Sequence, residues 1–307
     1  MDGSIATPTP EQMTWCQQTL KAPISCVGVG LHSGHRTTLT FRPAPADHGI
    51  VFRRADLGVD IPARFDRVVD TRLATVIGNG EARIGTIEHV MAALAGCGVD
   101  NAVVEVDGPE PPIVDGSAAP FAFLLDCAGV VAQDAPRATI EIRRPVRVSD
   151  GEAFAELRPA IPGMPGLAMS MTIDFPAPAI GRQALALHLT SSSFRAELAR
   201  ARTFTLLREI EQLRAAGLAQ GGSLENAVVV DEARVLNPAG LRMPDEFVRH
   251  KLLDAVGDLA LAGAAIHGRF VAHRSGHTLN HRLLQALFAD SATWRQAEPA
   301  QLSLAAE

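Results

Sequence analysis

The chain contains the stretch Glu246-Phe247-Val248-Arg249-His250-Lys251-Leu252-Leu253-Asp254-Ala255-Val256-Gly257-Asp258, in which one histidine and two aspartates follow at intervals of four residues. On an α-helix such positions stack along one face, so His250, Asp254 and Asp258 share a stripe. The other faces of this helix are apolar, through Leu252, Leu253, Val256 and Leu259. The pattern predicts a packed helix over residues 245–262, in which His250 and Asp254 could hold one divalent metal. In isolation, the same pair is also typical of a solvated helix surface.

A second cluster, Glu88-His89, lies far upstream and begins another helical pattern. Thr86 is suited to cap this short helix at its start, and Gly96 ends it. His89 could supply a third metal ligand, while Glu88 points about 100° away around the helix and flanks an open coordination position. Three protein ligands beside a free carboxylate are typical of a catalytic zinc site rather than a structural one. The alternative is a first-turn glutamate favoured by the helix dipole, next to an ordinary buried histidine.

Other segments carry further candidate residues. His277 follows a turn and begins a helix, where a carboxylate such as Asp258 would hold a proton on its imidazole. The glycine-rich loop 28–34 lacks the spacing of a dinucleotide-binding turn and leads into a strand, but His32 within it could reach a ligand. Thr203 precedes a helical stretch, which its hydroxyl is equally suited to cap.

Composition restricts the class of protein. The 307 residues are 47% hydrophobic and 20% charged, as in an ordinary globular protein. The formal net charge of −6 and the absence of tyrosine argue against a nucleic-acid partner. No apolar run reaches the length of a membrane span, and the N-terminus does not resemble a signal peptide, so we expect a cytoplasmic protein. The four cysteines form no C-x-x-C pair and are expected to be free thiols.

The alternation of patterns along the chain predicts an α+β protein. We expect a flexible N-terminal extension over residues 1–15 and a linker at 134–137. This linker divides the chain into two domains, 16–135 and 136–295, in each of which helices form a layer against a β-sheet. Strands are expected within 18–65 and at 101–106, 138–142, 152–158, 168–174, 226–230 and 267–272. Helices are expected at 117–128, 192–199, 206–216, 245–262 and 276–289.

Five motifs together resemble one family, although each alone is weak. They are Thr86-Ile87-Glu88-His89, Pro112-Ile113-Val114-Asp115-Gly116-Ser117, Ala201-Arg202-Thr203-Phe204, His250-Lys251-Leu252-Leu253-Asp254 and Ser275-Gly276-His277. Their order and spacing are similar to those of the zinc-dependent UDP-3-O-acyl-N-acetylglucosamine deacetylases of lipid A biosynthesis. The resemblance extends from about residue 18 to 290.

This resemblance assigns a role to each candidate residue. It implies that one zinc ion, or Fe²⁺ in its place, is bound by His89, His250 and Asp254. It implies that Glu88 is the general base, His277 the general acid and Thr203 a hydroxyl that stabilises the oxyanion. The residues it implies to contact the substrate or support the others are His32, Phe204, Lys251 and Asp258.

The resemblance also implies the architecture and the reaction. Two domains of similar topology are expected to hold the active site between them, and an insert at about 204–230 to form an apolar passage for the acyl chain. In this insert Thr205-Leu206-Leu207 stands where relatives often carry a Gly-Phe pair. The expected reaction hydrolyses the acetamide of UDP-3-O-acyl-N-acetylglucosamine and releases acetate, the committed step of lipid A biosynthesis, in a monomer.

Two alternative functions remain open at the level of sequence. One is a zinc amidohydrolase that acts on a different acylated substrate. The other is a non-catalytic protein that binds a lipid or a nucleotide sugar, in which the metal only joins two domains.

Overall fold

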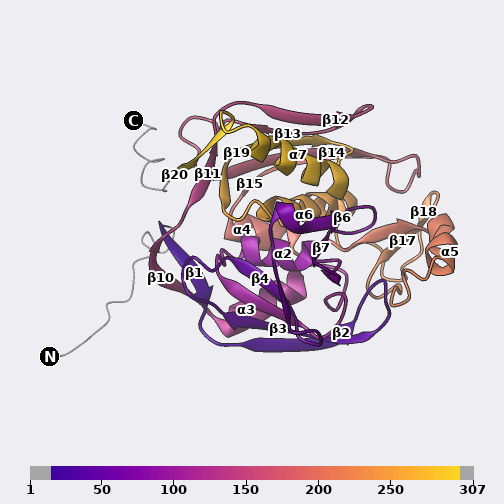
Figure 1. Cartoon of the computed structure of the whole chain (residues 1–307). Coiled ribbons are helices and arrows are strands. Elements are labelled where there is room, and N and C mark those ends of the chain that lie inside the picture. The colour runs from indigo at the N-terminus through magenta and orange to yellow at the C-terminus, as the bar shows by residue number, and fades with distance from the viewer. Residues whose placement is uncertain (1–14, 298–307) are drawn as a thin grey trace.

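The computed structural model describes residues 15–297, and it has two large β-sheets with helices between them (Figure 1). The predicted α+β class is confirmed. The N-terminal extension predicted over residues 1–15 lies, up to residue 14, outside the described residues. No helix between residues 15 and 297 is long and apolar enough to cross a membrane.

The first half of the chain supplies one of these large sheets, and each half also forms at least one small sheet of two or three strands. Its strands are β1 (Cys16–Leu20), β2 (Ile24–Val29), β3 (Arg36–Pro43), β4 (Ile50–Arg54), β5 (Val59–Pro62), β6 (Val68–Asp70), β7 (Val76–Asn79), β8 (Ala82–Ile84), β9 (Ala102–Val106) and β10 (Val130–Pro136). Its helices are η1 (Phe65–Arg67), α2 (Glu88–Gly96) and α3 (Ala119–Ala128).

The second half supplies the other sheet. Its strands are β11 (Thr139–Ile142), β12 (Val146–Asp150), β13 (Ala153–Arg158), β14 (Leu167–Asp174), β15 (Arg182–Leu189), β16 (Phe204–Leu206), β17 (Val228–Asp231), β18 (Arg234–Val235), β19 (Ala265–His273) and β20 (Trp294–Ala297). Its helices are α4 (Ser191–Ser193), η2 (Phe194–Leu198), α5 (Leu207–Ala215), α6 (Glu246–Ala260) and α7 (His277–Ala289).

The two large sheets have the same topology. The first runs in the order β2-β3-β9-β4-β5, and the second contains the order β12-β13-β19-β14-β15. In both, the third strand is parallel to the fourth, and the other neighbours are antiparallel. A helix precedes and another follows each central strand, α2 and α3 around β9, α6 and α7 around β19. The similarity of the two halves that the family resemblance implied is thus present in the strand order.

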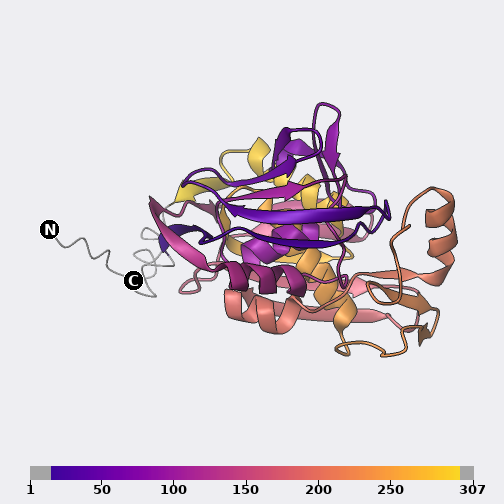
Figure 2. The same ribbon diagram turned by 90° about the horizontal axis from the view of Figure 1, so that it is seen from below.

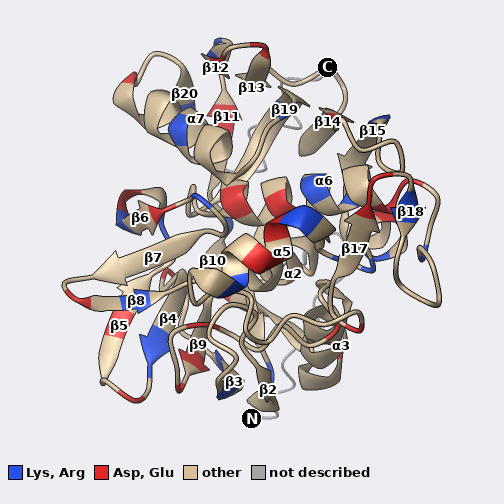
Figure 3. Cartoon of the chain, turned by 90° about the vertical axis from the view of Figure 1, so that its right-hand side faces the viewer, with Lys and Arg blue, Asp and Glu red and all other residues tan. Residues whose placement is uncertain are grey.

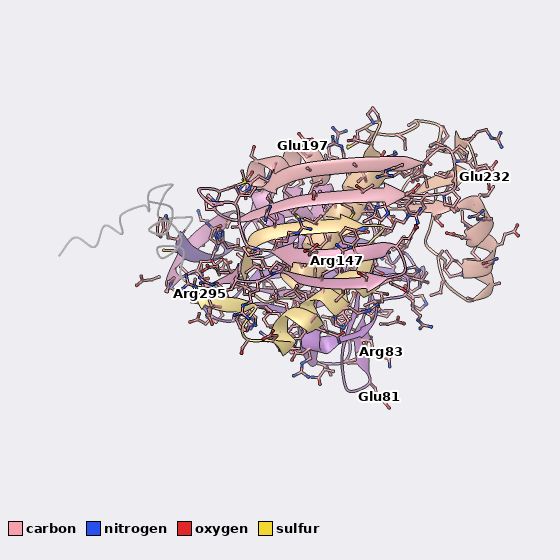
Figure 4. All side chains as sticks on the ribbon, turned by 90° about the horizontal axis from the view of Figure 1, so that it is seen from above. Glu81, Arg83, Arg147, Glu197, Glu232 and Arg295 are labelled. Carbon is pink, nitrogen blue, oxygen red and sulfur yellow. The ribbon has the colours of Figure 1, made fainter. Side chains whose placement is uncertain are left out.

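Each sheet is apolar toward the helices and polar on its outer face. In β14, for example, Leu167, Met169, Met171 and Ile173 are buried, and the residues between them are not. This alternation is expected of a strand with one solvated side. Figure 4 looks onto the outer face of the second sheet, which no helix of the described chain covers. Figure 2 shows the first sheet from below, with its helices behind and beside it.

Helices α2 and α6 pack against each other in the middle of the molecule. They approach so closely at Gly257 that a Cβ atom built there would lie 2.1 Å from the carbonyl oxygen of Glu88. Only glycine allows two backbones to come this near. The contact brings the stripe that carries His250 and Asp254 next to the first turn of α2.

An insertion precedes the central helix of each half. In the first half it is the small sheet β6-β7-β8, and in the second half it is β16, α5, β17 and β18. Figure 3 shows β6–β8 on one side of α6, β17 and β18 on the other, and α5 in front. The two insertions therefore flank the same end of the helix layer.

Two local predictions are wrong. Residues 134–137 are not a free linker, because β10 runs to Pro136 and pairs with β1 from Pro136↔Cys16 to Val130↔Leu20. Thr86 does not cap α2, since the N-cap is Ile87 and Thr86 has a left-handed backbone with φ of 53°. The Thr86 hydroxyl instead donates to Glu110 Oε2 at 3.1 Å. Both errors come from partners that are distant in sequence.

Candidate metal centre

His89 and the pair His250 and Asp254 come together between α2 and α6. One potential ligand atom from each lies within 4.8 Å of the others, and all three side chains are buried. The Oδ1 atom of Asp254 is 3.3 Å from His250 Nε2 and 3.7 Å from His89 Nε2. This is the separation expected when three ligand atoms surround a single ion at about 2.0–2.2 Å each.

The chemistry of these atoms fits a divalent metal. The carboxylate oxygen Oδ1 of Asp254 is buried and has no hydrogen-bond partner among the described residues, which is costly unless another group occupies the position. The Nδ1 atom of His250 lies 3.1 Å from the carbonyl oxygen of Ala201 and donates to it, so its Nε2 carries a lone pair toward Asp254. Burial lowers the pKa of His250 to about 4, which keeps the imidazole neutral, as a metal ligand must be.

The neighbours of Asp254 keep its carboxyl group ionised. Burial alone would raise the pKa of this carboxyl, but the positive charge of Lys251 and its hydrogen bond hold the pKa well below its usual range. Lys251 donates from Nζ to Oδ2 of Asp254 at 2.8 Å. Asp254 is therefore an anion, with one oxygen fixed by Lys251 and the other free for a metal.

Glu88 occupies the first turn of α2, beside His89. Its carboxylate is buried, and its Oε2 accepts a hydrogen bond of 3.0 Å from the backbone amide of Thr75. Burial raises the pKa of Glu88 above its usual value. A carboxylate whose pKa is moved toward neutrality is a better proton acceptor at physiological pH than an exposed glutamate.

His277 and Asp258 form a buried pair on the other side of the cluster. His277 Nδ1 donates to Asp258 Oδ2 at 2.9 Å, and His277 Nε2 lies 4.0 Å from Asp254 Oδ2. Burial alone would lower the pKa of His277, but the charges of Asp258, Glu88 and Asp254 raise it to about 9. The imidazolium therefore carries a proton at neutral pH and turns its Nε2 toward the metal ligands.

Asp258 has two further partners that sequence reasoning missed. Thr75 donates from Oγ1 to Oδ1 at 2.6 Å, and Asn280 donates from Nδ2 to Oδ2 at 2.8 Å. Thr75 precedes β7 and belongs to no recognisable motif. Asn280 does lie one turn beyond His277 on α7, so its position on the same helix was the only available signal.

Thr203 and Phe204 approach the cluster from the start of the second insertion. The amide of Thr203 donates to the carbonyl of Gly116 at 2.8 Å. The Phe204 ring packs edge-on against Phe247, at 5.0 Å, and His250, at 6.2 Å. The alternative that Thr203 caps the following helix is wrong, because α5 begins at Leu207 with Leu206 as its N-cap.

His32 reaches the site from the glycine-rich loop. The backbone amides of His32 and Ser33 donate to the carboxylate of Glu110, which is itself buried. Glu110 also accepts from Thr86, immediately before α2. One buried glutamate, which sequence reasoning did not single out, thus ties the His32 loop to the helix that carries Glu88 and His89.

These side chains surround one cavity of about 660 Å³. Nine of the ten predicted site residues line it, and Asp258 lies behind His277. A part of the wall is apolar and is formed by residues of the first and second insertions: Leu73, Leu206, Leu207, Ile210, Leu213, Leu224 and Val229. Helix α5 has no buried residue, so its leucines line the cavity and do not face a protein core.

The site combines two imidazoles with a carboxylate that has one oxygen without a hydrogen-bond partner in the described part of the chain. A buried glutamate lies on one side of this cluster and a charged histidine on the other. Together these groups define a class of protein. They are the parts of a metal-dependent hydrolase, in which the base and the acid are separate groups. The comparison with known proteins identifies the family within this class.

Residues 17–289 match the family model LpxC, described as UDP-3-O-acyl N-acetylglycosamine deacetylase. The chain is 54% identical over 282 residues to a protein of Anaeromyxobacter dehalogenans, with 92% of this chain and 90% of the relative covered. It is 54% identical over 276 residues to one of Myxococcus xanthus, and 52% identical over 283 residues to one of Shewanella baltica strain OS155. These cover 89% and 91% of this chain and 87% and 91% of the relatives.

Each of these relatives is called a UDP-3-O-acyl-N-acetylglucosamine deacetylase. The chain belongs to this family, the hydrolytic deacetylases of lipid A biosynthesis. The resemblance drawn from the five motifs is confirmed.

Proposed function

We propose that the chain removes the acetyl group of UDP-3-O-acyl-N-acetylglucosamine with one zinc ion bound by His89, His250 and Asp254. The observation that carries this proposal is the buried Oδ1 of Asp254, which has no hydrogen-bond partner within residues 15–297 and faces the Nε2 atoms of both histidines. Glu88 and His277 stand on either side as base and acid. The proposal excludes a metal that only joins two domains, because such a metal would need neither group.

Zinc, when bound at these ligands, supplies a Lewis acid that lowers the pKa of water toward about 7 and polarises the acetamide carbonyl. Glu88 accepts the proton of the attacking water as the new C–O bond forms. The Thr203 hydroxyl donates to the oxygen that becomes negative, a contribution of about 2.7–4 kcal/mol for a well-placed donor. His277 gives its Nε2 proton to the sugar nitrogen as the C–N bond breaks, which leaves acetate and a free amine.

The cavity suits both ends of this substrate. We assign its apolar wall, which includes Leu207, Ile210 and Leu213, to the acyl chain. Such a wall removes methylene groups from water at about 0.8 kcal/mol each. His32, Phe204 and Lys251 line the same cavity, and we assign them to contacts with the sugar and its diphosphate. The positive charge of Lys251 favours an anionic substrate group.

We further propose zinc as the physiological ion, the cytoplasm as the compartment and a monomer as the active form. Two imidazoles and one carboxylate suit zinc, although Fe²⁺ accepts the same ligands. Metal analysis of the protein purified without added metal decides between them. Light scattering of the purified protein tests the monomer.

The direct test of the chemistry is Glu88→Gln. This change keeps the shape of the side chain but removes the base, so kcat is expected to fall by about 10²–10⁴-fold while the protein retains one equivalent of metal. The measurement is acetate release from the nucleotide sugar together with metal content. A Glu88→Gln protein that keeps its metal and the wild-type rate would exclude Glu88 as the base.

A zinc amidohydrolase with another acylated substrate is the remaining rival. The two are distinguished by comparing kcat/KM for the UDP-linked sugar with kcat/KM for N-acetyl sugars that lack the nucleotide. We expect the nucleotide sugar to be preferred, because Lys251 lies in the cavity beside the metal ligands. A preference for sugars without the nucleotide would favour the rival.

A further inference from the structure

We propose that Thr75 is a positioning residue of the deacetylation, which holds the base and the acid in fixed relation to each other. This inference rests on the proposed roles of Glu88 and His277. Thr75 lies between the two groups. Its backbone amide donates to Glu88, and its hydroxyl donates to Asp258, the partner of His277.

The backbone of Thr75 fixes the start of α2. Its amide donates to Glu88 Oε2 at 3.0 Å, and its carbonyl accepts a longer bond of 3.4 Å from the amide of Ile87. The Glu88 carboxylate is therefore held by one oxygen, which leaves the other for the proton of the attacking water. A buried carboxylate with a single fixed oxygen cannot rotate freely, since rotation would leave that oxygen without a donor.

The hydroxyl of Thr75 fixes the orientation of Asp258. It donates to Oδ1 at 2.6 Å, while Oδ2 accepts from His277 Nδ1 and from Asn280. The 3.3 Å separation between the hydroxyl and His277 Nδ1 is secondary, because that ring nitrogen already donates to the carboxylate. With both oxygens occupied, Asp258 has one orientation, and this sets the direction in which His277 presents Nε2.

Thr75 itself is well suited to this role because its side chain is only 2% exposed. Water does not compete for its hydroxyl, so loss of that group would not be repaired by solvent. Partners that orient a reacting group through a second residue typically contribute about 10–100-fold to activity. We expect substitution of Thr75 to lower the rate of the chemical step rather than the affinity for substrate, since Thr75 is not among the residues that line the cavity.

The experiment compares Thr75→Val, Thr75→Ala and Thr75→Ser in the full-length metal-loaded protein. Valine and alanine remove the hydroxyl, whereas serine keeps it. We expect kcat to fall by about 10–100-fold in the first two, with KM changed less than about 2-fold and one equivalent of metal retained, and serine to restore most of the rate. If the Thr75→Val protein does not fold, the Thr75→Ala protein provides the same test.

Thr37→Val is the matched control. Thr37 is also 2% exposed, and its hydroxyl also donates to an aspartate, Asp107, at 2.9 Å, but in the first sheet away from the cavity. We expect it to lower the melting temperature without lowering kcat. The inference is overturned if Thr75→Val or Thr75→Ala keeps the wild-type kcat, if serine fails to restore the rate, or if Thr37→Val lowers kcat as much.

The same assay separates this inference from the proposed function. A wild-type protein that releases no acetate from the nucleotide sugar contradicts the function itself. A wild-type protein that is active, together with an equally active Thr75→Val, contradicts only the role of Thr75.

Discussion

At the scale of single residues, the site depends on carboxylates whose surroundings give them different tasks. Asp254 is kept anionic by Lys251, and burial raises the pKa of Glu88, which makes it a stronger base than an exposed glutamate. Asp258 has no direct contact with the cavity and acts on His277. In the proposed reaction, three acidic side chains of ordinary chemistry thereby serve as a ligand, a base and a counter-ion.

The His277–Asp258 pair leads to a prediction about pH. The general acid must be protonated, so activity is present below the pKa of His277 and is lost as the pH rises through it. Because Asp258 is the largest favourable contributor to that raised pKa, Asp258→Asn should lower it and move the alkaline limb of the kcat/KM profile to lower pH. An alkaline limb that stays in place in Asp258→Asn would contradict this assignment of His277.

Residue patterns pointed to the three side chains that come together as candidate metal ligands, but not to the groups that support them. His250, Asp254 and Asp258 repeat at the helical interval, so the stripe was visible in the letters alone. Thr75 carries no such pattern, because it meets Asp258 across 183 positions of sequence. A hydrogen bond of this kind is created by the fold and leaves no local signal.

At the scale of elements, the crossing of α2 and α6 creates the candidate metal site. Gly257 stands on α6 between the two predicted aspartate positions of the stripe, opposite Glu88. The helical pattern predicted both helices, and Gly96 ends α2 as expected. The crossing itself could not be predicted, since an isolated glycine in a helix does not reveal which backbone it meets.

Gly257→Ala tests this crossing. Its Cβ would lie 2.1 Å from the Glu88 carbonyl, so the helices must separate and carry His89 away from Asp254. We expect at least about a 10-fold loss of metal affinity and a fall in stability of about 1–3 kcal/mol, the usual cost of overpacking. Metal titration and thermal unfolding measure the two effects.

Gly85→Ala is the control for this substitution. A Cβ there would meet Val76 at 3.4 Å, an ordinary contact. We expect this variant to bind metal as the wild type does. Equal metal affinity in Gly257→Ala and the wild type would show that the close approach of the helices is not required.

Several strands were not predicted, among them β6 to β8, β12, β15, β18 and β20, and β10 was taken for a linker. The misses at β10, β12 and β15 have a common physical cause. These strands lie at the edge of a sheet or in a two-stranded ladder, so few of their residues are buried. Without a buried face, the alternation of apolar and polar residues that marks a strand becomes weak.

At the scale of the whole molecule, two halves with the same strand order meet face to face through their helices. The first half contributes Glu88, His89 and Thr75, and the second contributes His250, Asp254 and His277. Neither half alone contains the ligand set or both the acid and the base. We infer that the metal also stabilises the assembly of the two halves, because it binds to ligands from both.

The insertions complete this arrangement. β6–β8 and the segment from β16 to β18 flank the same end of the helix layer, and both supply residues to the cavity wall. The sequence predicted the second insertion only through the family resemblance. Helix α5 within it has no buried residue, so its apolar residues are free to line the cavity.

The measurement that tests the account most directly is anomalous X-ray diffraction at the zinc edge from crystals of the zinc-loaded protein. We predict one peak between α2 and α6, at about 2.0–2.2 Å from the Nε2 atoms of His89 and His250 and from Oδ1 of Asp254, with no fourth protein ligand. A peak at other residues, or one enclosed by four protein ligands, would contradict the account.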